Sequence, residues 1–210
     1  MGECLQEVAK PHDHDPDPAT TTRLTSVTPP SFLSHAAPGS VMTELSLIIR
    51  SEQPADSEAI ERLHERAFGP GRFARTASRL REGAPHLLDL SFTALVGTLL
   101  VGSVRLTPVM AGEEPALMLG PLTVEPAFES RGIGAALMRR SLDAAREKDH
   151  TLVLLVGDEP YYARFGFRRI PSRQLALPGP VNPDRFLALE LSEGALSRAR
   201  GLVVPLPASA

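Results

Sequence analysis

The residues best suited to chemistry lie in the segment 129–134, ESRGIG, which stands between an apolar run ending at Val124 and a helical pattern beginning at Ile133. The first N–H groups of a helix have no partner within the helix, and this end has about half a positive charge. Gly132 and Gly134 remove Cβ atoms where an anion must approach the backbone. The pattern therefore predicts a phosphate site, to which Arg131 adds a mobile cation.

Three interpretations of this loop compete. The first is an ordinary strand-to-helix connection with two turn glycines. The second is a dinucleotide-binding loop, G-x-G-x-x-G, but the third position of that pattern is Leu137, and seven residues separate Val124 from Gly132 where a tight turn is expected. The third is a loop that binds acyl-CoA.

The segment 119–137 resembles motif A of the GNAT N-acetyltransferase superfamily, a strand followed by V-x-P and then by Q/R-x-x-G-x-G/A at a helix start. The matching positions are Leu122, Val124, Pro126, Arg131, Gly132, Ile133, Gly134 and Leu137. Residues 157–167, GDEPYYARFGF, are similar to the family's late motif, F-Y-x-x-x-G-F, and to the segment GD-x-x-YY-x-RFGF of one bacterial branch. The resemblance covers about residues 44–195.

The resemblance implies a site for acetyl-CoA as co-substrate and no metal. Backbone amides of the loop would bind the CoA pyrophosphate, and the strand 122–124 would splay at a bulge and pair with the pantetheine arm. The residues implied in this cofactor site are Leu122, Thr123, Val124, Glu129, Ser130, Arg131, Gly132, Ile133, Gly134 and Ala135. Glu129 departs from the family's Gln or Arg, and its carboxylate would repel a pyrophosphate by about 1 kcal/mol in a wet site.

Tyr162 matches a tyrosine with a conserved role in the family, so the resemblance implies that it is catalytic. A thiol of pKa about 8.5 leaves more readily when it receives a proton, and a phenol of pKa about 10 can supply one. The alternative is a packing aromatic, which is the role we expect for Tyr161. The N–H groups of residues 122–124 could polarise the thioester carbonyl.

No base for the acceptor amine stands out in the sequence. Glu125, Asp158 and Glu159 are carboxylates at the ends of two strands, and a solvated loop acid is the expected role of each. Members of the superfamily often use a water relay instead of one fixed base. No His/Asp/Ser or His/Cys arrangement suggests an acyl-enzyme, so we expect direct transfer in a ternary complex.

The resemblance therefore implies an N-acetyltransferase that moves an acetyl group from acetyl-CoA to a primary amine of a small molecule or protein. The alternative is a CoA-sensing or structural module that keeps the fold without transfer. The acceptor groove of the family would correspond to residues 68–72 and 173–185. Dimerisation is common in the family, so a homodimer is an open alternative.

The elements that position these residues follow from hydrophobic periodicity and turn signals. Residues 151–156, TLVLLV, are apolar on both faces, as in a central strand covered on both sides. The order βααβββαβαβ predicts the α/β class, a GNAT-like fold with a mixed central sheet and helices on both faces. Strands are expected at 45–50, 91–96, 99–106, 117–124, 151–156, 167–170 and 185–191, and helices at 54–68, 73–81, 133–148 and 160–164.

Composition bounds the remaining possibilities. The chain has 210 residues and a net charge of −3, so no global positive field recruits nucleic acid or acidic lipid. The lone cysteine, Cys4, excludes an internal disulfide and a cysteine-based zinc site. This composition suits a reducing cytosol and holds no membrane-spanning run, so we expect a cytoplasmic protein without a membrane partner.

Three regions are expected along the chain. Residues 1–43, rich in Pro, Thr, Ser and Asp, are predicted to be a disordered N-terminal extension, and His12 and His14 within it to bind metals only adventitiously. Residues 44–195 form the predicted acetyltransferase domain, and residues 196–210 a C-terminal tail. Met42 stands just before the first strand and is an alternative start of translation.

Overall fold

The computed structural model of the chain describes residues 46–69, 80 and 84–206. The predicted N-terminal extension, with Cys4, His12 and His14, lies outside these residues. Most of the predicted helix 73–81 also lies outside them, and its one described residue, Leu80, is helical and fully buried.

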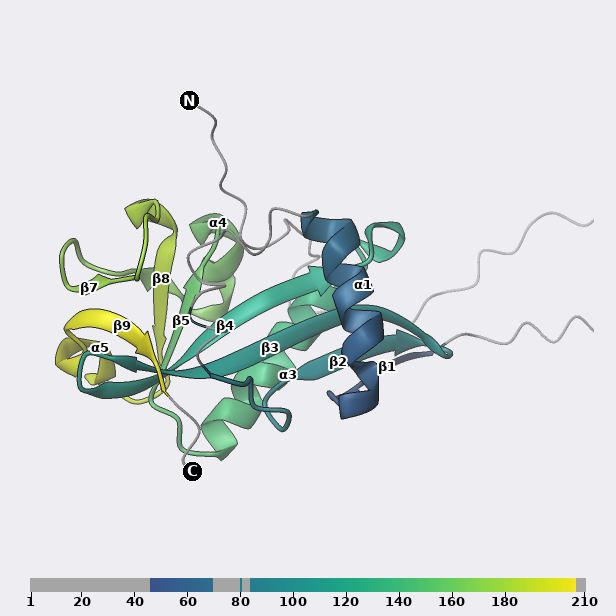
Figure 1. Cartoon of the computed structure of the whole chain (residues 1–210), viewed down its shortest axis with the longest axis horizontal. Helices are drawn as coiled ribbons and strands as arrows, with labels where there is room; N and C mark the ends of the chain where they lie inside the picture. The colour runs from purple at the N-terminus through teal and green to yellow at the C-terminus, as the bar shows by residue number, and fades with distance from the viewer. Residues whose placement is uncertain (1–45, 70–79, 81–83, 207–210) are drawn as a thin grey trace, which may run out of the picture.

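One mixed sheet forms the centre of the molecule, with the strand order β1-β2-β3-β4-β5-β8-β6 (Figure 1). Every neighbouring pair in this order is antiparallel except β4 and β5, which are parallel. The mixed sheet predicted from the sequence is therefore confirmed. Its strands are β1 (Leu47–Ser51), β2 (Phe92–Val96), β3 (Leu99–Ala111), β4 (Glu114–Val124), β5 (Leu152–Val156), β8 (Phe186–Glu190) and β6 (Arg168–Arg169).

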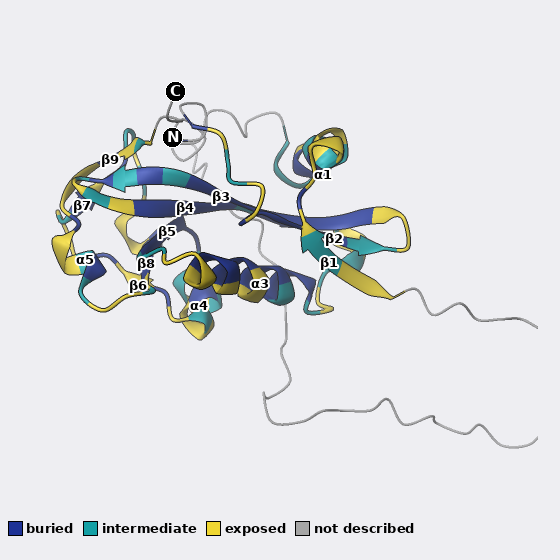
Figure 2. Cartoon of the chain, turned by 90° about the horizontal axis from the view of Figure 1, so that it is seen from below, coloured by how far each residue is buried: buried dark blue, intermediate teal, exposed yellow. Residues whose placement is uncertain are grey.

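Helices cover both faces of the sheet, as the sequence predicted (Figure 2). The short η1 (Pro54–Asp56) leads into α1 (Ser57–Phe68), which buries Ile60, Leu63 and His64 on one side of the sheet. On the other side lie α3 (Ile133–Glu147) and α4 (Glu159–Tyr162). We call these two sides of the sheet the α1 face and the α3 face.

The strand β5 is covered on both sides, as its apolar sequence predicted. All five of its residues are buried, and they alternate between two hydrophobic clusters. Val153 and Leu155 join the cluster on the α3 face, which Ile133 and Leu137 of α3 complete. The other cluster, on the α1 face, holds Leu152, Leu154 and Val156.

The C-terminal segment differs from the predicted tail. Within residues 196–206 the chain forms most of α5 (Ala195–Arg198) and all of β9 (Gly201–Pro205), which pairs antiparallel with β3 and parallel with β7 (Leu175–Ala176). Val203 is fully buried on the α1 face, so this described part of the segment belongs to the folded sheet. The strand β3 also runs to Ala111, past Pro108, where the sequence predicted its end at 106.

Candidate active site

The parallel strands β4 and β5 begin side by side and then separate. They pair at Leu117↔Val153 and Met118↔Leu154, and no further pair joins the described residues of the two strands. Yet β4 continues to Val124 and β5 to Val156, and their ends diverge (Figure 1). This separation, which we call the splay, leaves one edge of residues 119–124 without a neighbouring strand.

Backbone groups of β4 face the splay. Glu125 donates its N–H to the carbonyl oxygen of Val101 on β3 at 2.8 Å, and Thr123, two residues earlier, pairs with Ser103 of the same strand. Because backbone groups alternate between the two edges of a strand, those of Leu122 and Val124 face the splay. These are two of the residues whose N–H groups we expected to polarise a thioester carbonyl.

A β-bulge precedes this stretch. Val104 pairs with Leu122 while Leu106 pairs with Leu119, so β4 has one extra residue at positions 120–121. The bulge expected within residues 122–124 thus lies just before them. A one-residue shift moves side chains to the other face, so Leu122 joins the core on the α3 face and Thr123 lies on the α1 face.

The N-terminus of α3 has the geometry of the predicted phosphate site. The loop after β4 passes through η3 (Pro126–Phe128) and reaches Gly132, the N-cap, at φ +77°, a left-handed conformation that favours glycine. No side chain caps the helix, and the first intrahelical donor is the N–H of Ala136, bound to the Gly132 carbonyl at 2.9 Å. The N–H groups of residues 133–135 therefore have no acceptor within the helix.

Close packing holds α3 against the end of β4. A Cβ atom on Gly102 of β3 would lie 3.0 Å from Leu137 Cδ1 and 3.2 Å from the Thr123 carbonyl oxygen. Gly102 pairs with Val124, so the start of α3 lies directly against the last residues of β4. The absence of a side chain at Gly102 thus fixes the phosphate loop relative to the splay.

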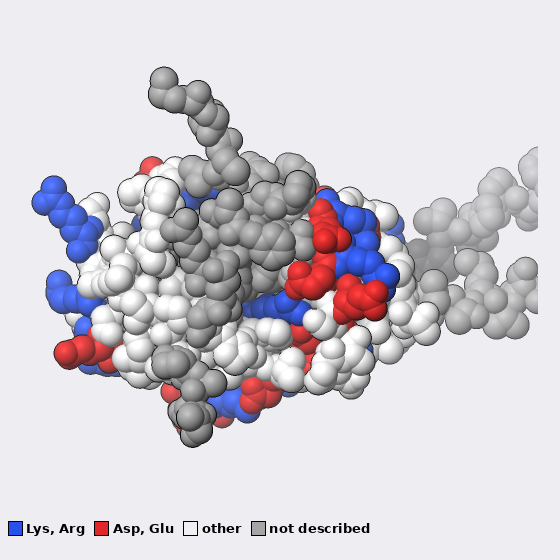
Figure 3. All heavy atoms as spheres, in the orientation of Figure 1, with Lys and Arg blue, Asp and Glu red and all other residues white. Residues whose placement is uncertain are grey.

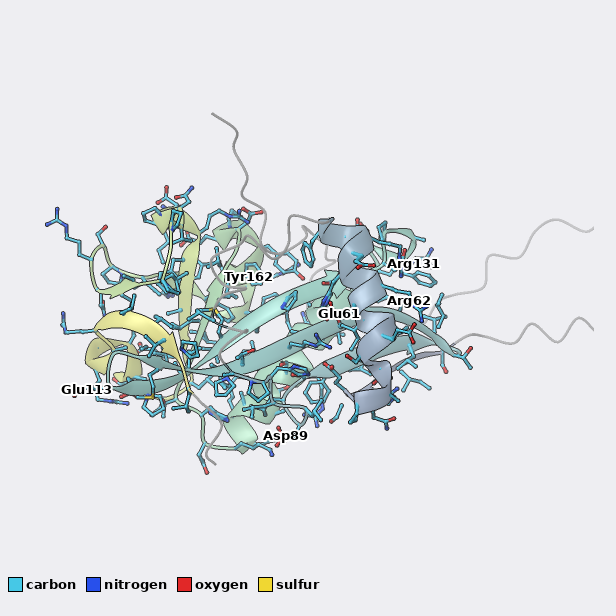
Figure 4. The ribbon with its side chains drawn as sticks, in the orientation of Figure 1. Glu61, Arg62, Asp89, Glu113, Arg131 and Tyr162 are labelled. Carbon is cyan, nitrogen blue, oxygen red and sulfur yellow. The ribbon has the colours of Figure 1, made fainter. Side chains whose placement is uncertain are left out.

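The side chains of the loop lie at the surface. The Arg131 guanidinium covers the Phe128 ring at 5.3 Å from its centroid, and both Arg131 and Ser130 are exposed (Figure 4). Ser130 has φ +57°, and Glu129 is half-buried. The predicted contact runs through backbone N–H groups and does not require the Glu129 side chain.

Tyr162 lies in the core on the α3 face. Its side chain is 2% exposed, and its hydroxyl has no hydrogen-bond partner among the residues that the structure describes. Burial is the main cause that raises the pKa of Tyr162 well above 10.0, so the phenol is protonated at neutral pH. A buried hydroxyl without a partner costs about 1–3 kcal/mol, which a bound group that accepts its proton would recover.

The rest of the segment 157–167 fixes the ring of Tyr162. A Cβ atom on Gly157 would lie 2.3 Å from Cε2 of that ring. Phe167 packs edge-on at 6.0 Å between centroids, and Tyr161 does so at 4.9 Å. The Arg164 guanidinium covers the outer side of Tyr161 at 4.1 Å. The motif thus folds as one unit in which Tyr161 packs against Tyr162.

The three carboxylates considered as bases each face an arginine. Glu125 accepts hydrogen bonds from Arg66 of α1, the shorter at 2.7 Å. Asp158 lies 3.3 Å from Arg185, and Glu159 accepts a hydrogen bond from Arg169. Each pair holds its carboxylate in place, so these acids connect separate segments of the chain.

A row of hydroxyls crosses the α1 face, and the sequence analysis did not identify it. Thr93 pairs with Ser103, and Ser103 pairs with Thr123, on β2, β3 and β4 in turn. These side chains are 0%, 0% and 1% exposed. His64 of α1, itself buried, places Nε2 3.2 Å from the Ser103 Oγ. We call Thr93, Ser103 and Thr123 the hydroxyl row.

A charged cluster lies beside the hydroxyl row. Arg105 of β3 binds Glu52 at 2.7 Å and Glu61 of α1 at 3.1 Å, and His86 lies 3.0 Å from Glu52. Burial by itself would raise the pKa of Glu52, but hydrogen bonds from His86 and Arg105 outweigh it and lower that pKa below its ordinary 4.5. The cluster attaches α1 to the sheet.

The outer surface of α1 mixes acidic and basic side chains, as Figure 3 shows on this face. One such pair is Arg62 with Glu58, at 3.2 Å and one helical turn apart. Exposed pairs of this kind contribute at most about 1 kcal/mol to stability. Because both residues belong to α1, this pair does not join the helix to the sheet, whereas the cluster around Arg105 does.

A pocket of about 400 Å³ opens beside the end of β5. Its wall comes from residues 170–186 and includes Ile170, Val181 and Phe186. Phe186 pairs with Val156, the last residue of β5, and both belong to the cluster on the α1 face. Part of the segment 173–185, expected in the acceptor groove, thus lines a pocket at the start of β8, across β5 from the splay.

Comparisons with known proteins agree with this architecture. Residues 57–167 match the model of the acetyltransferase (GNAT) family. The chain is 30% identical over 159 residues to YhbS, an uncharacterized N-acetyltransferase of Escherichia coli K12, a match that covers 75% of this chain and 95% of YhbS. The chain belongs to the GNAT acetyltransferase family, which is a family of acyltransferase enzymes.

Two solved structures extend this likeness to ligand-bound relatives. The crystal structure of Escherichia coli YhbS in complex with CoA superposes with a TM-score of 0.66 at 28% identity, covering 82% of this chain and 94% of that one. A GNAT family acetyltransferase from Brucella melitensis, in complex with acetyl-CoA, gives 0.51 at 30% identity over 69% and 96% of the two chains.

The residues that the structure describes contain neither a candidate metal site nor a candidate membrane-spanning helix. Within them, no three His, Cys, Asp or Glu side chains are grouped so that they could hold a metal ion. Among the helices of the same residues, none has the length and apolar character needed to cross a membrane.

Proposed function

We propose that the protein transfers an acetyl group from acetyl-CoA to a primary amine of a small molecule or protein, directly within a ternary complex. The observation that carries the proposal is the splay itself. The uncapped N-terminus of α3 lies at the end of the loop that leaves it, and the buried hydroxyl of Tyr162 lies in the core of the same face. One extended ligand with a phosphate and a reactive end suits this arrangement.

Backbone groups would bind the cofactor. The N–H groups of Ile133, Gly134 and Ala135 would hold the pyrophosphate, with Arg131 above it. The backbone of Leu122 and Val124 would pair with the pantetheine arm as a further strand, and an N–H of this edge would polarise the thioester carbonyl. When bound, acetyl-CoA supplies an activated acetyl group.

Tyr162 would donate its proton to the sulfur that departs. The raised pKa keeps this phenol protonated, and its hydroxyl has no competing acceptor among the described residues. Hydrogen bonding of a developing thiolate by a buried phenol stabilises the transition state more than the ground state. Tyr162 would thus act on the leaving group and not on the amine.

The acceptor would approach from the α1 face. The phosphate loop and Tyr162 lie on the α3 side, whereas the pocket lined by residues 170–186 adjoins the cluster on the α1 face. A ligand placed through the splay would present its acetyl group between these sides. The relatives support the cofactor, because YhbS was solved with CoA and the Brucella melitensis protein with acetyl-CoA.

Binding and turnover together test the proposal. Calorimetry with acetyl-CoA should give saturable binding, and free thiol should appear only when an acceptor is added from a panel of polyamines, arylalkylamines, amino acid amides and peptide N-termini. Mass spectrometry should then find the acceptor heavier by about 42 Da, because one acetyl group replaces one hydrogen. Binding without thiol release on the whole panel would favour the CoA-sensing module and contradict transfer.

A further inference from the structure

We propose that His64 receives the proton that the acceptor ammonium loses, through the hydroxyls of Thr123 and Ser103. This inference rests on the proposed function, since only transfer to an amine requires that proton to leave. The geometry that points to it is the buried hydroxyl row, which leads from β4 at the splay to an imidazole on α1.

The first link of this path is direct. His64 Nε2 lies 3.2 Å from the Ser103 Oγ, and both side chains are almost fully buried, at 3% and 0% exposure. A neutral imidazole that accepts from a serine hydroxyl at Nε2 has its proton on Nδ1. That Nδ1 lies 3.8 Å from a carboxylate oxygen of Glu61, one turn earlier on α1.

The second link follows from strand register. Ser103 and Thr123 are directly paired across β3 and β4, so their Cβ atoms lie about 5 Å apart on the same face. The Thr123 Oγ1 is buried and has no hydrogen-bond partner among the described residues, Ser103 included, so the Thr123 side chain must rotate toward the Ser103 Oγ to close this link. Thr123 also stands between Leu122 and Val124, the residues whose backbone faces the splay. Of the three hydroxyls in the row, that of Thr123 is therefore the one nearest to the proposed position of the thioester and the amine.

The bulge at positions 120–121 creates this arrangement. Leu117 and Leu119 lie in the core of the α3 face, so an unbroken alternation would have placed residue 123 on that face as well. The extra residue instead turns Thr123 toward α1, where Ser103 and His64 lie. A strand that only had to fill the core would not need this shift.

The proton steps balance. The ammonium N–H gives its proton to the Thr123 Oγ1, whose own proton passes to the Ser103 Oγ, and the proton of Ser103 passes to Nε2 of His64. The free amine then forms the C–N bond and the C–S bond breaks. The amine nitrogen loses its second proton to solvent, and the sulfur receives one from Tyr162. The Thr123 and Ser103 hydroxyls end neutral, His64 ends as imidazolium and Tyr162 as phenolate. His64 then releases its proton to solvent, and Tyr162 takes one back from solvent, which restores the starting state.

The charges around His64 suit this extra proton. In the described chain, the charged side chains that face it are Glu61 on α1 and Arg105 on β3, which binds the same Glu61 oxygen. Arg105 also binds Glu52, which His86 contacts. The Glu61 carboxylate beside Nδ1 attracts a cation at His64. The Phe68 ring also lies near the imidazole of His64, at 6.1 Å between ring centroids.

A purely structural hydroxyl row is the alternative, and pH separates it from a proton path. His64→Gln keeps an amide that can bind Ser103 but does not titrate. For the wild type, kcat/KM should be level over the pH range in which the imidazole is neutral and the amine is still an ammonium. For His64→Gln it should be lower by about 100-fold at pH 7 and should rise tenfold per pH unit as free amine forms, approaching the wild type near pH 9.

Thr123→Val supplies an isosteric variant in case His64→Gln does not fold. It removes one hydroxyl without a described partner and leaves the His64–Ser103 contact in place. Thr107→Val is its matched control, since Thr107 is also fully buried on β3 and its hydroxyl has no partner among the described residues, yet Thr107 pairs with Met118, before the splay. His86→Gln is the matched control for His64→Gln, because it replaces another histidine that lies outside the proposed path.

The experiment measures kcat/KM from pH 6 to 10 for these variants, with the panel amine that the wild type acetylates fastest and with acetyl-CoA affinity as the check on folding. We expect the steep pH dependence in His64→Gln and Thr123→Val, and the wild-type profile in Thr107→Val and His86→Gln. Profiles parallel to the wild type in both His64→Gln and Thr123→Val would overturn the proton path alone. A wild type that acetylates no amine of the panel would overturn the proposed function and the proton path with it.

Discussion

The ring of Tyr162 occupies the space where a side chain on Gly157 would begin. A Cβ atom at Gly157 would lie 2.3 Å from Cε2 and 2.9 Å from Cδ2 of the ring, and 3.1 Å from Leu155 Cδ1. Gly157 follows β5 directly, so the end of this strand and the ring form one contact. The position of the proposed proton donor therefore depends on the absence of one carbon atom.

Gly157→Ala tests this contact. The added methyl cannot be accommodated unless the ring moves, and overpacking of this kind costs about 1–3 kcal/mol of stability. We expect a loss of that size in urea unfolding, together with reduced turnover and retained acetyl-CoA affinity. In a Tyr162→Ala background the same substitution should cost far less, because the ring is gone. Equal costs in both backgrounds would show that the contact is not the cause.

Gly132→Ala tests the phosphate site. Gly132 and Gly69 both have positive φ, +77° and +66°, and neither would bring a Cβ atom within 4 Å of another residue. Alanine should therefore cost about 1–3 kcal/mol of backbone strain at either position. Only Gly132→Ala should also weaken acetyl-CoA binding, measured by calorimetry, since Gly69 lies at the end of α1. Matching affinities for the two variants would remove Gly132 from the site.

Glu129→Gln should strengthen cofactor binding. Removal of a carboxylate beside a pyrophosphate relieves about 1 kcal/mol of repulsion, or about a fivefold gain in acetyl-CoA affinity. Salt screens this repulsion, because the Debye length falls about threefold, to about 4 Å, between 50 and 500 mM NaCl. The gain in acetyl-CoA affinity should therefore shrink over this range. An unchanged dissociation constant at low salt would mean that the Glu129 carboxylate lies away from the phosphates.

Acid should loosen the attachment of α1 through Glu52. The folded-state pKa of Glu52 is lowered, so its contribution is present above the ordinary 4.5 and is lost as pH falls through the lowered value. Urea unfolding should show wild-type stability falling below about pH 4.5. Glu52→Gln should lose about 1–3 kcal/mol at pH 7 and depend less steeply on acid pH. Parallel pH curves for the two chains would contradict this assignment.

The sequence predicted what local patterns can encode. The central strand at 151–156 was visible because both of its faces are apolar, and the helix at 133 because glycines precede a helical repeat. The match of residues 57–167 to the family confirms the resemblance on which the site was proposed. The segment 201–205, GLVVP, shows no alternation of apolar and polar residues that would indicate a strand, and only pairing with β3 and β7 reveals it.

The hydroxyl row was out of reach of the sequence for a different reason. Thr93, Ser103 and Thr123 belong to three strands, and their common face depends on register. The bulge at 120–121 reverses the alternation of β4 without a pattern that predicts its position. In the sequence, His64 is indistinguishable from the other residues on the buried side of the predicted helix. Its contact with Ser103 forms only when α1 packs on the sheet.

Tyr162→Phe tests the central claim most directly. The change removes one buried oxygen without a described partner, so stability and acetyl-CoA affinity should be kept. Turnover of the best panel amine should fall about 100-fold, because the departing sulfur loses its proton donor. Tyr161→Phe, the neighbouring ring, is the control and should stay within a few-fold of wild type. Undiminished turnover by Tyr162→Phe with acetyl-CoA bound would contradict the account.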